Sequence, residues 1–330
     1  MNLFYYLISL PLIMTSNIMI FLLNNSFYMW MIMEMNLIGF ISFLMTNKMM
    51  SQELTMTYFL IQSFNSYLFL MSMITMKIKM MTNLPFMMII FSMFSKMGMP
   101  PFHLWYLKFM KSLNWNLFIV NSTIQKMIPL YVIKTFMKMS MTLILLMIMS
   151  LLSLMIMPIF AMKEYSLKLI LSYSSMIQIS WIIMVMTMNN KTWILFFMVY
   201  SICSFALVEM FKKLNMNYLF ELAKSNSKLN LWATLLILSI SGLPPFLGFA
   251  SKFMFFNNMN LMNTLTMNVL ILMFSMLNFY FYMKISIKVV TMFSLNNKMI
   301  LMNKNSTLKM NKLYLMMIFS LMMSLLYEMF

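Results

Sequence analysis

The chain contains no arginine, no aspartate, one cysteine and one histidine among 330 residues. The single cysteine, Cys203, excludes a disulfide within the chain. Haem and copper sites in membrane subunits usually need several histidine or cysteine ligands, so Cys203 and the single histidine, His103, argue against a redox centre. We therefore expect this chain itself to bind no metal and no cofactor.

Glycine is also scarce, with four residues, and neither a P-loop nor a dinucleotide-binding glycine pattern is present. Charged residues make up 9% of the chain and hydrophobic residues 63%, whereas about a quarter of a soluble domain is charged. The net charge of +17 would suggest nucleic acid as a partner of a soluble protein. Here the lysines are scattered over short loops, where they act as topology signals. The composition predicts an all-α polytopic membrane domain over residues 1–330, with no nucleic-acid partner.

Long apolar runs separated by lysine, asparagine and serine clusters predict about eleven membrane-spanning helices of roughly 20 residues each. The expected spans are 4–23, 26–45, 54–76, 84–110, 116–137, 141–160, 166–188, 191–211, 229–256, 261–285 and 312–328. The fourth and ninth of these spans are long and interrupted.

Methionine occurs 54 times, and asparagine, lysine, isoleucine, phenylalanine and tyrosine are abundant, as an A+T-rich genome favours. The first lysine is Lys48, so no basic presequence precedes the first apolar run. These features predict synthesis inside an invertebrate mitochondrion. Fifteen lysines lie in or beside the even-numbered connections and five beside the odd-numbered ones. The positive-inside rule then predicts a matrix N-terminus and, with eleven helices, a C-terminus in the intermembrane space.

An internal repeat of the pattern Gly-x-Pro-Pro-Phe occurs in the two interrupted spans. Its copies are Gly98, Met99, Pro100, Pro101 and Phe102, and Gly242, Leu243, Pro244, Pro245 and Phe246. Paired prolines remove backbone donors and clash with the preceding turn, so each helix should break there. Because the two copies lie five helices apart, their helices cross the membrane in opposite directions. This arrangement predicts an inverted-topology repeat with two discontinuous helices, and two simple proline kinks are the alternative.

Four charged residues lie inside the expected spans, away from the loops: Glu34, Lys96, Lys126 and Lys252. A charge near the bilayer centre costs roughly 2.5–3.5 kcal/mol on insertion scales, and by default it marks an ion pathway or a proton relay. Desolvation favours the neutral form of an amine, so a lysine in such a place can exchange its proton. We therefore predict that these four residues form a proton path.

Opposite charges in one hydrophobic bundle should pair, so we expect Glu34 to contact Lys96. The pair is either a static link that fixes helix packing or a switch whose opening changes the proton affinity of the next lysine. That next lysine is Lys126, and Pro129 should break or loosen its helix just beyond it. The alternative for Lys126 is a structural lysine bonded to freed backbone carbonyls.

Two further residues have open roles. Lys252 follows the second proline pair by seven residues, and it is either the terminal proton site or a lysine that extends to the membrane surface. His103 follows the first proline pair, and it either relays protons or caps the broken helix.

Three segments together resemble the antiporter-like subunits of respiratory complex I. They are residues 94–105 (FSKMGMPPFHLW), 125–129 (QKMIP) and 241–253 (SGLPPFLGFASKF). The resemblance covers essentially the whole chain. The chain's length and its segment 34–36 (EMN) are similar to the short animal mitochondrial form, which lacks three N-terminal helices of its bacterial relatives.

The resemblance implies a role for each membrane charge. Glu34 matches the family's glutamate that pairs with the lysine at Lys96, Lys126 matches the central lysine of the channel, and Lys252 matches the terminal one. The missing helices also imply a matrix N-terminus, in agreement with the lysine count.

One position departs from the family. Leu107 and Lys108 stand where many relatives carry Pro-Glu, so we expect no acidic group at that helix end.

The resemblance further implies an obligate hetero-oligomer in the mitochondrial inner membrane that oxidises NADH, reduces ubiquinone and translocates protons. Its neighbours would be other membrane-arm subunits (of the chain 4, 4L and 5 types), accessory subunits and membrane lipids. NADH, flavin, iron–sulfur clusters and ubiquinone would bind to other subunits. Two other classes of function remain open from the residues alone: a stand-alone cation/proton antiporter, and a purely structural membrane spacer with static ion pairs.

Overall fold

The structure is a computed structural model that describes residues 2–23, 25–45, 51–78, 83–137, 140–188, 192–222, 227–243, 246–259 and 265–297. Over these residues the secondary structure is helical without any strand, and an isolated antiparallel bridge joins Ser166 to Tyr218. The all-α prediction is therefore confirmed. The expected span 312–328 and two residues of the second motif, Pro244 and Pro245, lie outside the described residues.

Six helices in the described ranges are long and apolar enough to cross a membrane. They are α2 (Ser26–Leu44), α3 (Gln52–Ile78), α8 (Ser140–Ala161), α9 (Leu167–Met188), α10 (Trp193–Lys213) and α14 (Leu265–Asn297). Shorter apolar helices form parts of α1 (Asn2–Leu22), α4 (Leu84–Met97) and α12 (Ser227–Ser241). The number of eleven spans stays a prediction.

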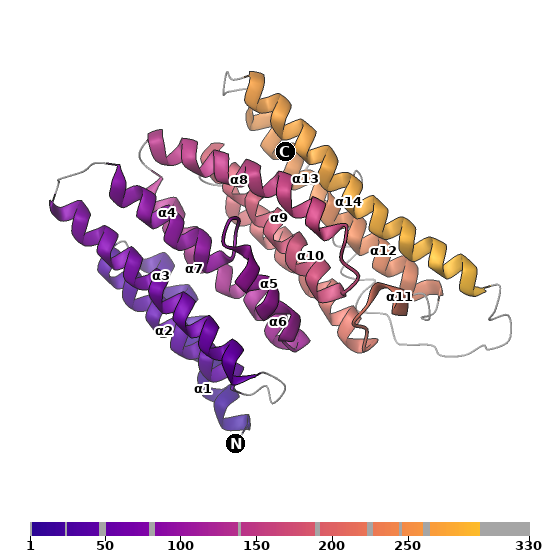
Figure 1. Cartoon of the computed structure of the whole chain (residues 1–330), viewed down its shortest axis with the longest axis horizontal. Coiled ribbons are helices and arrows are strands. Elements are labelled where there is room, and N and C mark those ends of the chain that lie inside the picture. The colour runs from indigo at the N-terminus through magenta and orange to yellow at the C-terminus, as the bar shows by residue number, and fades with distance from the viewer. Residues whose placement is uncertain are drawn as a thin grey trace. The chain divides into compact units, whose positions relative to one another are not determined.

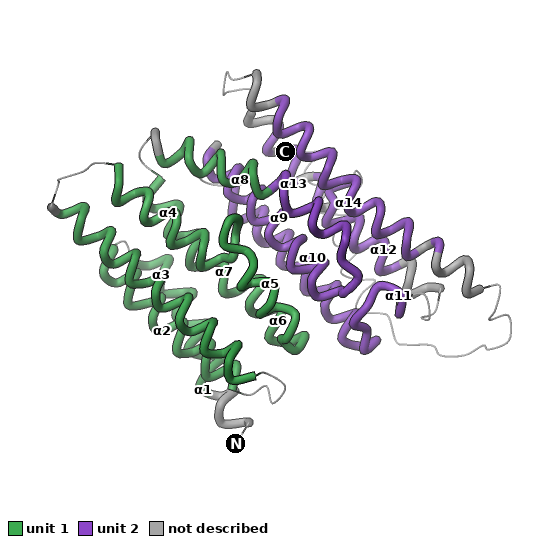
Figure 2. The backbone as a smooth tube through the Cα atoms, in the orientation of Figure 1, with its two compact units in different colours: residues 1–153 green, residues 154–330 purple. Residues whose placement is uncertain are grey.

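The chain forms two compact units, residues 1–153 and 154–330, coloured separately in Figure 2. In the first unit α1, α2, α3 and α4 pack in chain order, each against the next along α1–α2–α3–α4. Helix α7 (Ile124–Phe136) packs against α4, α1 and α2 (Figure 1). An aromatic cluster lies inside this unit, where the Tyr58 ring stacks on Phe109 with centroids 4.7 Å apart.

In the second unit α10 packs against α9, α12 and α13 (Leu247–Met259), and α14 packs against α12 and the short α11 (Leu219–Leu222). Almost all of α9 is buried. A single membrane domain over the whole chain stays a prediction.

Each Gly-x-Pro-Pro-Phe motif falls where one helix has ended and the next has not begun. Helix α4 ends at Met97 and α5 (His103–Ser112) begins at His103, while α12 ends at Ser241 and α13 begins at Leu247. The glycines adopt similar left-handed conformations, with φ of 70° at Gly98 and 79° at Gly242.

The backbone hydrogen bonds of the two motifs also match. The Gly98 N–H donates to Ser95 O at 3.2 Å, and the Gly242 N–H donates to Ser239 O at 3.3 Å. The N–H of each motif's phenylalanine donates to the carbonyl three residues earlier, at 2.8 Å in both copies. The two turns are therefore locally alike. Their interpretation as discontinuous helices of an inverted repeat stays a prediction.

The expected span 116–137 is divided into two helices, α6 (Trp115–Ser122) and α7, at Thr123, whose backbone has φ −118° and ψ −76°. The Thr123 hydroxyl donates to the Ile119 carbonyl at 2.7 Å, so it competes with the helix for that acceptor. Helix α7 continues through Pro129. The interruption near Lys126 therefore lies at Thr123, three residues before Lys126. The expected break at Pro129 is not observed.

Candidate functional site

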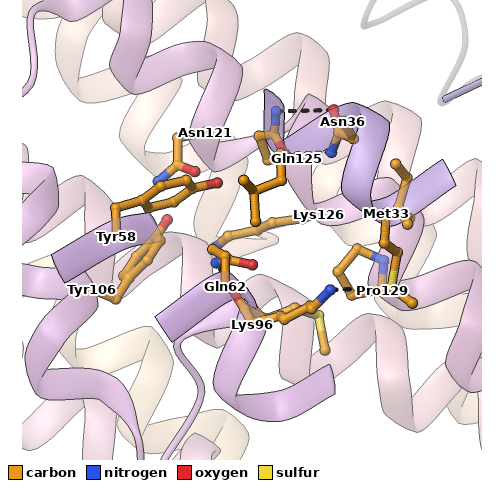
Figure 3. A pocket seen from close by; sticks show the side chains of 13 residues that line it. Met33, Asn36, Tyr58, Gln62, Lys96, Tyr106, Asn121, Gln125, Lys126 and Pro129 are labelled. Atoms are coloured by element: carbon orange, nitrogen blue, oxygen red, sulfur yellow. Dashed lines mark hydrogen bonds between the residues drawn. The ribbon is translucent and has the colours of Figure 1, made fainter. Parts of the chain in front are cut away.

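The first unit contains a polar cavity of about 30 Å³ that brings two of the predicted lysines together (Figure 3). Its lining is Met33, Asn36, Leu37, Tyr58, Gln62, Lys96, Met97, Tyr106, Asn121, Gln125, Lys126, Ile128 and Pro129. A polar cavity needs roughly 10–15 Å³ to hold one water molecule. This one is therefore large enough for water between Lys96 and Lys126.

Lys126 lies in the first turn of α7 and is 2% exposed. Its Nζ lies 4.7 Å from the centroid of the Tyr106 ring, within the range of a cation–π contact. Tyr106 comes from α5 and packs directly on Gly98, where an added Cβ would lie 2.4 Å from the Tyr106 Cβ. The glycine of the first motif thus makes room for the ring beneath the Lys126 ammonium.

Lys96 lies in the last turn of α4 and is half-buried. Its Nζ is 3.2 Å from the Met33 sulfur of α2. Its backbone carbonyl accepts a hydrogen bond from the Gln62 side-chain amide of α3 at 3.1 Å. Both ends of this residue are therefore held by neighbouring helices.

Glu34 does not make the direct contact with Lys96 that the sequence predicts. In the described part of the chain no ion pair joins the two, and the Glu34 carboxylate accepts a hydrogen bond from the Ser66 hydroxyl of α3. The reason is helical phase, because successive residues of an α-helix point about 100° apart. Met33 therefore faces Lys96, while Glu34 turns toward α3.

A reciprocal amide pair forms another part of the cavity lining (Figure 3). Asn36 Nδ2 donates to Gln125 Oε1 at 2.6 Å, and Gln125 Nε2 donates back to Asn36 Oδ1 at 3.2 Å. The Ser16 hydroxyl of α1 also donates to Asn36 Oδ1, at 3.3 Å. These contacts tie α1, α2 and α7 together next to Lys126.

Lys252 belongs to the second unit, where it lies on α13 and is 8% exposed. Its Nζ donates to the Ser241 carbonyl at the end of α12 and lies 5.4 Å from the centroid of the Trp181 ring. Gly242 makes this possible, because an added Cβ there would lie 2.7 Å from Lys252 Cδ. The side chain therefore folds back onto the end of α12.

His103 begins α5 and is half-buried, and the residues that line the cavity do not include it. The structure therefore places it at the start of α5, directly after the first motif. Its role as relay or cap stays a prediction.

The sequence analysis missed Gln62, Tyr106 and Asn121, which all line the cavity. A signal was present for the two amides, because polar side chains within membrane helices usually face other helices. Tyr106 carried no comparable signal among the 15 tyrosines of the chain.

The chain has clear relatives. The family described as "NADH:quinone oxidoreductase/Mrp antiporter, TM" matches residues 24–278. NADH-ubiquinone oxidoreductase chain 2 of Locusta migratoria is 33% identical over 297 residues, which are 86% of this chain and 83% of that one. The protein of the same name from Rhipicephalus sanguineus is 34% identical over 317 residues, 94% of this chain and 98% of that one.

Solved structures share the fold. A chain of respiratory complex I from Thermus thermophilus with bound aureothin superimposes with a TM-score of 0.75 at 16% identity, covering 91% of this chain and 73% of that one. A chain of the Mrp complex from Dietzia sp. DQ12-45-1b superimposes with a TM-score of 0.72 at 15% identity, covering 83% and 58%. The fold is therefore that of the antiporter-like membrane subunits.

Proposed function

We propose a proton-coupling mechanism from the premise that this chain belongs to the NADH:quinone oxidoreductase/Mrp antiporter family and, within it, to NADH-ubiquinone oxidoreductase chain 2. The chain is thus a subunit of respiratory complex I and a mitochondrial membrane protein. Its role in the membrane arm is proton translocation.

The proposed path uses Glu34, Lys96, Lys126 and Lys252. The observation that carries it is that Lys96 and Lys126 line the same cavity. Two ammonium groups in a small cavity of low dielectric repel each other, so a proton held by one weakens the binding of a proton by the other. This coupling allows a charge shift at Lys96 to expel a proton from Lys126.

Glu34 would regulate the proton affinity of Lys96. Redox energy released in other subunits moves its carboxylate from Ser66 toward Lys96, which favours the charged form of Lys96. The proton of Lys126 then leaves through water in the cavity, and Lys252 serves as the terminal site. Moving one charge against the membrane potential costs about 2.3 kcal/mol per 100 mV, so access must alternate between the two sides.

The remaining expectations belong to the same proposal. The N-terminus lies in the matrix and the C-terminus in the intermembrane space. The partners are the other membrane-arm subunits, including neighbours of the chain 4, 4L and 5 types, together with accessory subunits and lipids. Flavin, iron–sulfur clusters and the quinone site belong to other subunits.

Replacing the central lysine tests the path. Lys126→Met keeps the length of the side chain and removes the group that holds the proton. In inner-membrane vesicles, we expect normal complex assembly, coupled NADH:ubiquinone turnover lowered roughly tenfold or more, and fewer protons pumped per NADH. The measurements are quinone-dependent NADH oxidation and acidification of the vesicle lumen.

The matched control is Lys213→Met, because the Lys213 side chain is 59% exposed and pairs with Glu209 on the surface of α10. Exposed pairs contribute little, so we expect wild-type pumping. An unchanged proton yield in Lys126→Met, with or without poorer assembly, would contradict the path and favour a structural spacer.

A further inference from the structure

Both proline motifs free a backbone carbonyl at the same position. In a continuous helix the carbonyl of residue i accepts the N–H of residue i+4. The carbonyl of Lys96 would need the N–H of residue 100, and that of Ile240 would need the N–H of residue 244. Both of those residues are prolines, which have no N–H.

A glutamine from a neighbouring helix binds each of these freed carbonyls. Gln62 of α3 donates to Lys96 O at 3.1 Å, and Gln178 of α9 donates to Ile240 O at 2.9 Å. The acceptors occupy equivalent positions, two residues before Gly98 and Gly242. Each unit therefore contains one glutamine that donates to the freed carbonyl, and the two glutamines belong to different helices.

Gln62 also lines the cavity that Lys96 and Lys126 share. Figure 3 shows its amide between the two lysine side chains. Two other cavity amides, those of Asn36 and Gln125, hydrogen-bond to each other. One N–H of the Gln62 amide donates to the Lys96 carbonyl. The amide oxygen is an acceptor, so it can bind a donor in the cavity.

We propose that Gln62 is a positioning residue for proton transfer between Lys96 and Lys126. Its amide nitrogen fixes the end of α4 through the Lys96 carbonyl. Its amide oxygen accepts a hydrogen bond from the lysine that carries the proton, or from a water molecule between the two. The inference rests on the proposed function, since it assigns a role within that path.

Two substitutions separate positioning from simple bracing. Gln62→Met preserves length and removes both the donor and the acceptor. Gln62→Glu preserves the acceptor oxygen and removes the donor. The control is Gln52→Met, because Gln52 is exposed at the start of the same helix.

We expect the Gln62→Met complex to assemble and to reduce ferricyanide with NADH at the wild-type rate. Its quinone-coupled turnover and its protons pumped per NADH should fall, the turnover by roughly two- to tenfold, because the path loses one oriented group. Gln62→Glu keeps an acceptor for the lysines but loses the donor to the Lys96 carbonyl, so its losses should be smaller than those of Gln62→Met. Gln52→Met should match the wild type.

Three results would overturn the inference: wild-type pumping in Gln62→Met, equal losses in Gln62→Met and Gln62→Glu, or failure of both to assemble. The second result would leave Gln62 with a bracing role only, and the third would assign it to folding. Lys126→Met separates this inference from the proposed function. If that variant stops pumping while Gln62→Met does not, only the present inference fails. If Lys126→Met itself pumps normally, the proposed function fails.

Discussion

Lys126 shows how single residues make a buried amine possible in this chain. It is nearly inaccessible, yet an aromatic face lies 4.7 Å from its Nζ and polar amides line the same cavity. The aromatic face depends on Gly98, since a side chain at that position would occupy the space of Tyr106. The chemistry of one lysine is thus set by a glycine 28 positions earlier.

Gly98→Ala tests this dependence. The new Cβ would lie 2.4 Å from Tyr106 Cβ, and φ is 70°, a conformation unfavourable for alanine. We expect a loss of about 2–4 kcal/mol in stability from the combined strain and overlap. The measurement is the midpoint of thermal inactivation of the intact complex.

Gly39→Ala is the matched control. Its Cβ would lie 3.1 Å from Leu12 Cβ within a regular helix, so the tight contact is offset by the better helix propensity of alanine. We expect a change within about 1 kcal/mol. Equal midpoints for the two variants would refute the packing argument for Gly98.

At the scale of helices, the ends of α4 and α12 present backbone carbonyls to side chains of other helices. Helices α4 and α12 end at Gly-x-Pro-Pro motifs, and α6 ends just before Thr123. Each proline interruption exposes carbonyls that side chains then bind: Gln62 and Gln178 at the first freed carbonyl, and Lys252 at Ser241. Carbonyls that cannot face lipid thereby receive hydrogen bonds from other parts of the protein.

The contact of α2 with α7 yields a prediction for the Asn36–Gln125 pair. Gln125→Leu removes one partner and leaves a buried amide without its acceptor, which should cost about 1–2 kcal/mol. Adding Asn36→Leu should cost less than the sum of the single losses, because the double variant leaves no orphaned amide.

A double-mutant cycle on the thermal midpoint of the complex measures this coupling. Thr57→Val provides the control, since Thr57 is exposed and its hydroxyl donates to the Leu54 carbonyl of its own helix. Additive losses for Asn36 and Gln125 would show that the pair does not hold the two helices together.

At the scale of the whole molecule, each unit contains a buried lysine next to the end of a helix, α4 in the first unit and α12 in the second. The buried lysine is Lys126 in the first unit and Lys252 in the second. Membership in the family makes this chain one subunit of a larger enzyme. One of the two other classes that the residues alone left open, a free cation/proton antiporter, would need no partner.

Native separation of detergent-solubilised inner membranes distinguishes these two. We expect mass spectrometry to find the chain in the large band that stains for NADH dehydrogenase activity. Cation exchange by the purified chain alone, or its presence only in a band that does not oxidise NADH, would support the free antiporter instead.

The sequence by itself determined the all-α membrane class, the positions of the buried charges, the two proline motifs and the family. These features follow from the covalent structure of single residues. A lysine amine stands out within an apolar run, and a proline nitrogen has no hydrogen to donate. Only the tertiary structure decided which side chains meet. The rotation of α2 turns Met33 toward Lys96 and Glu34 toward Ser66, and the approach of α3 brings Gln62 to the Lys96 carbonyl. Such contacts depend on the relative rotation of packed helices, which a sequence of nearly uniform hydrophobicity does not encode locally.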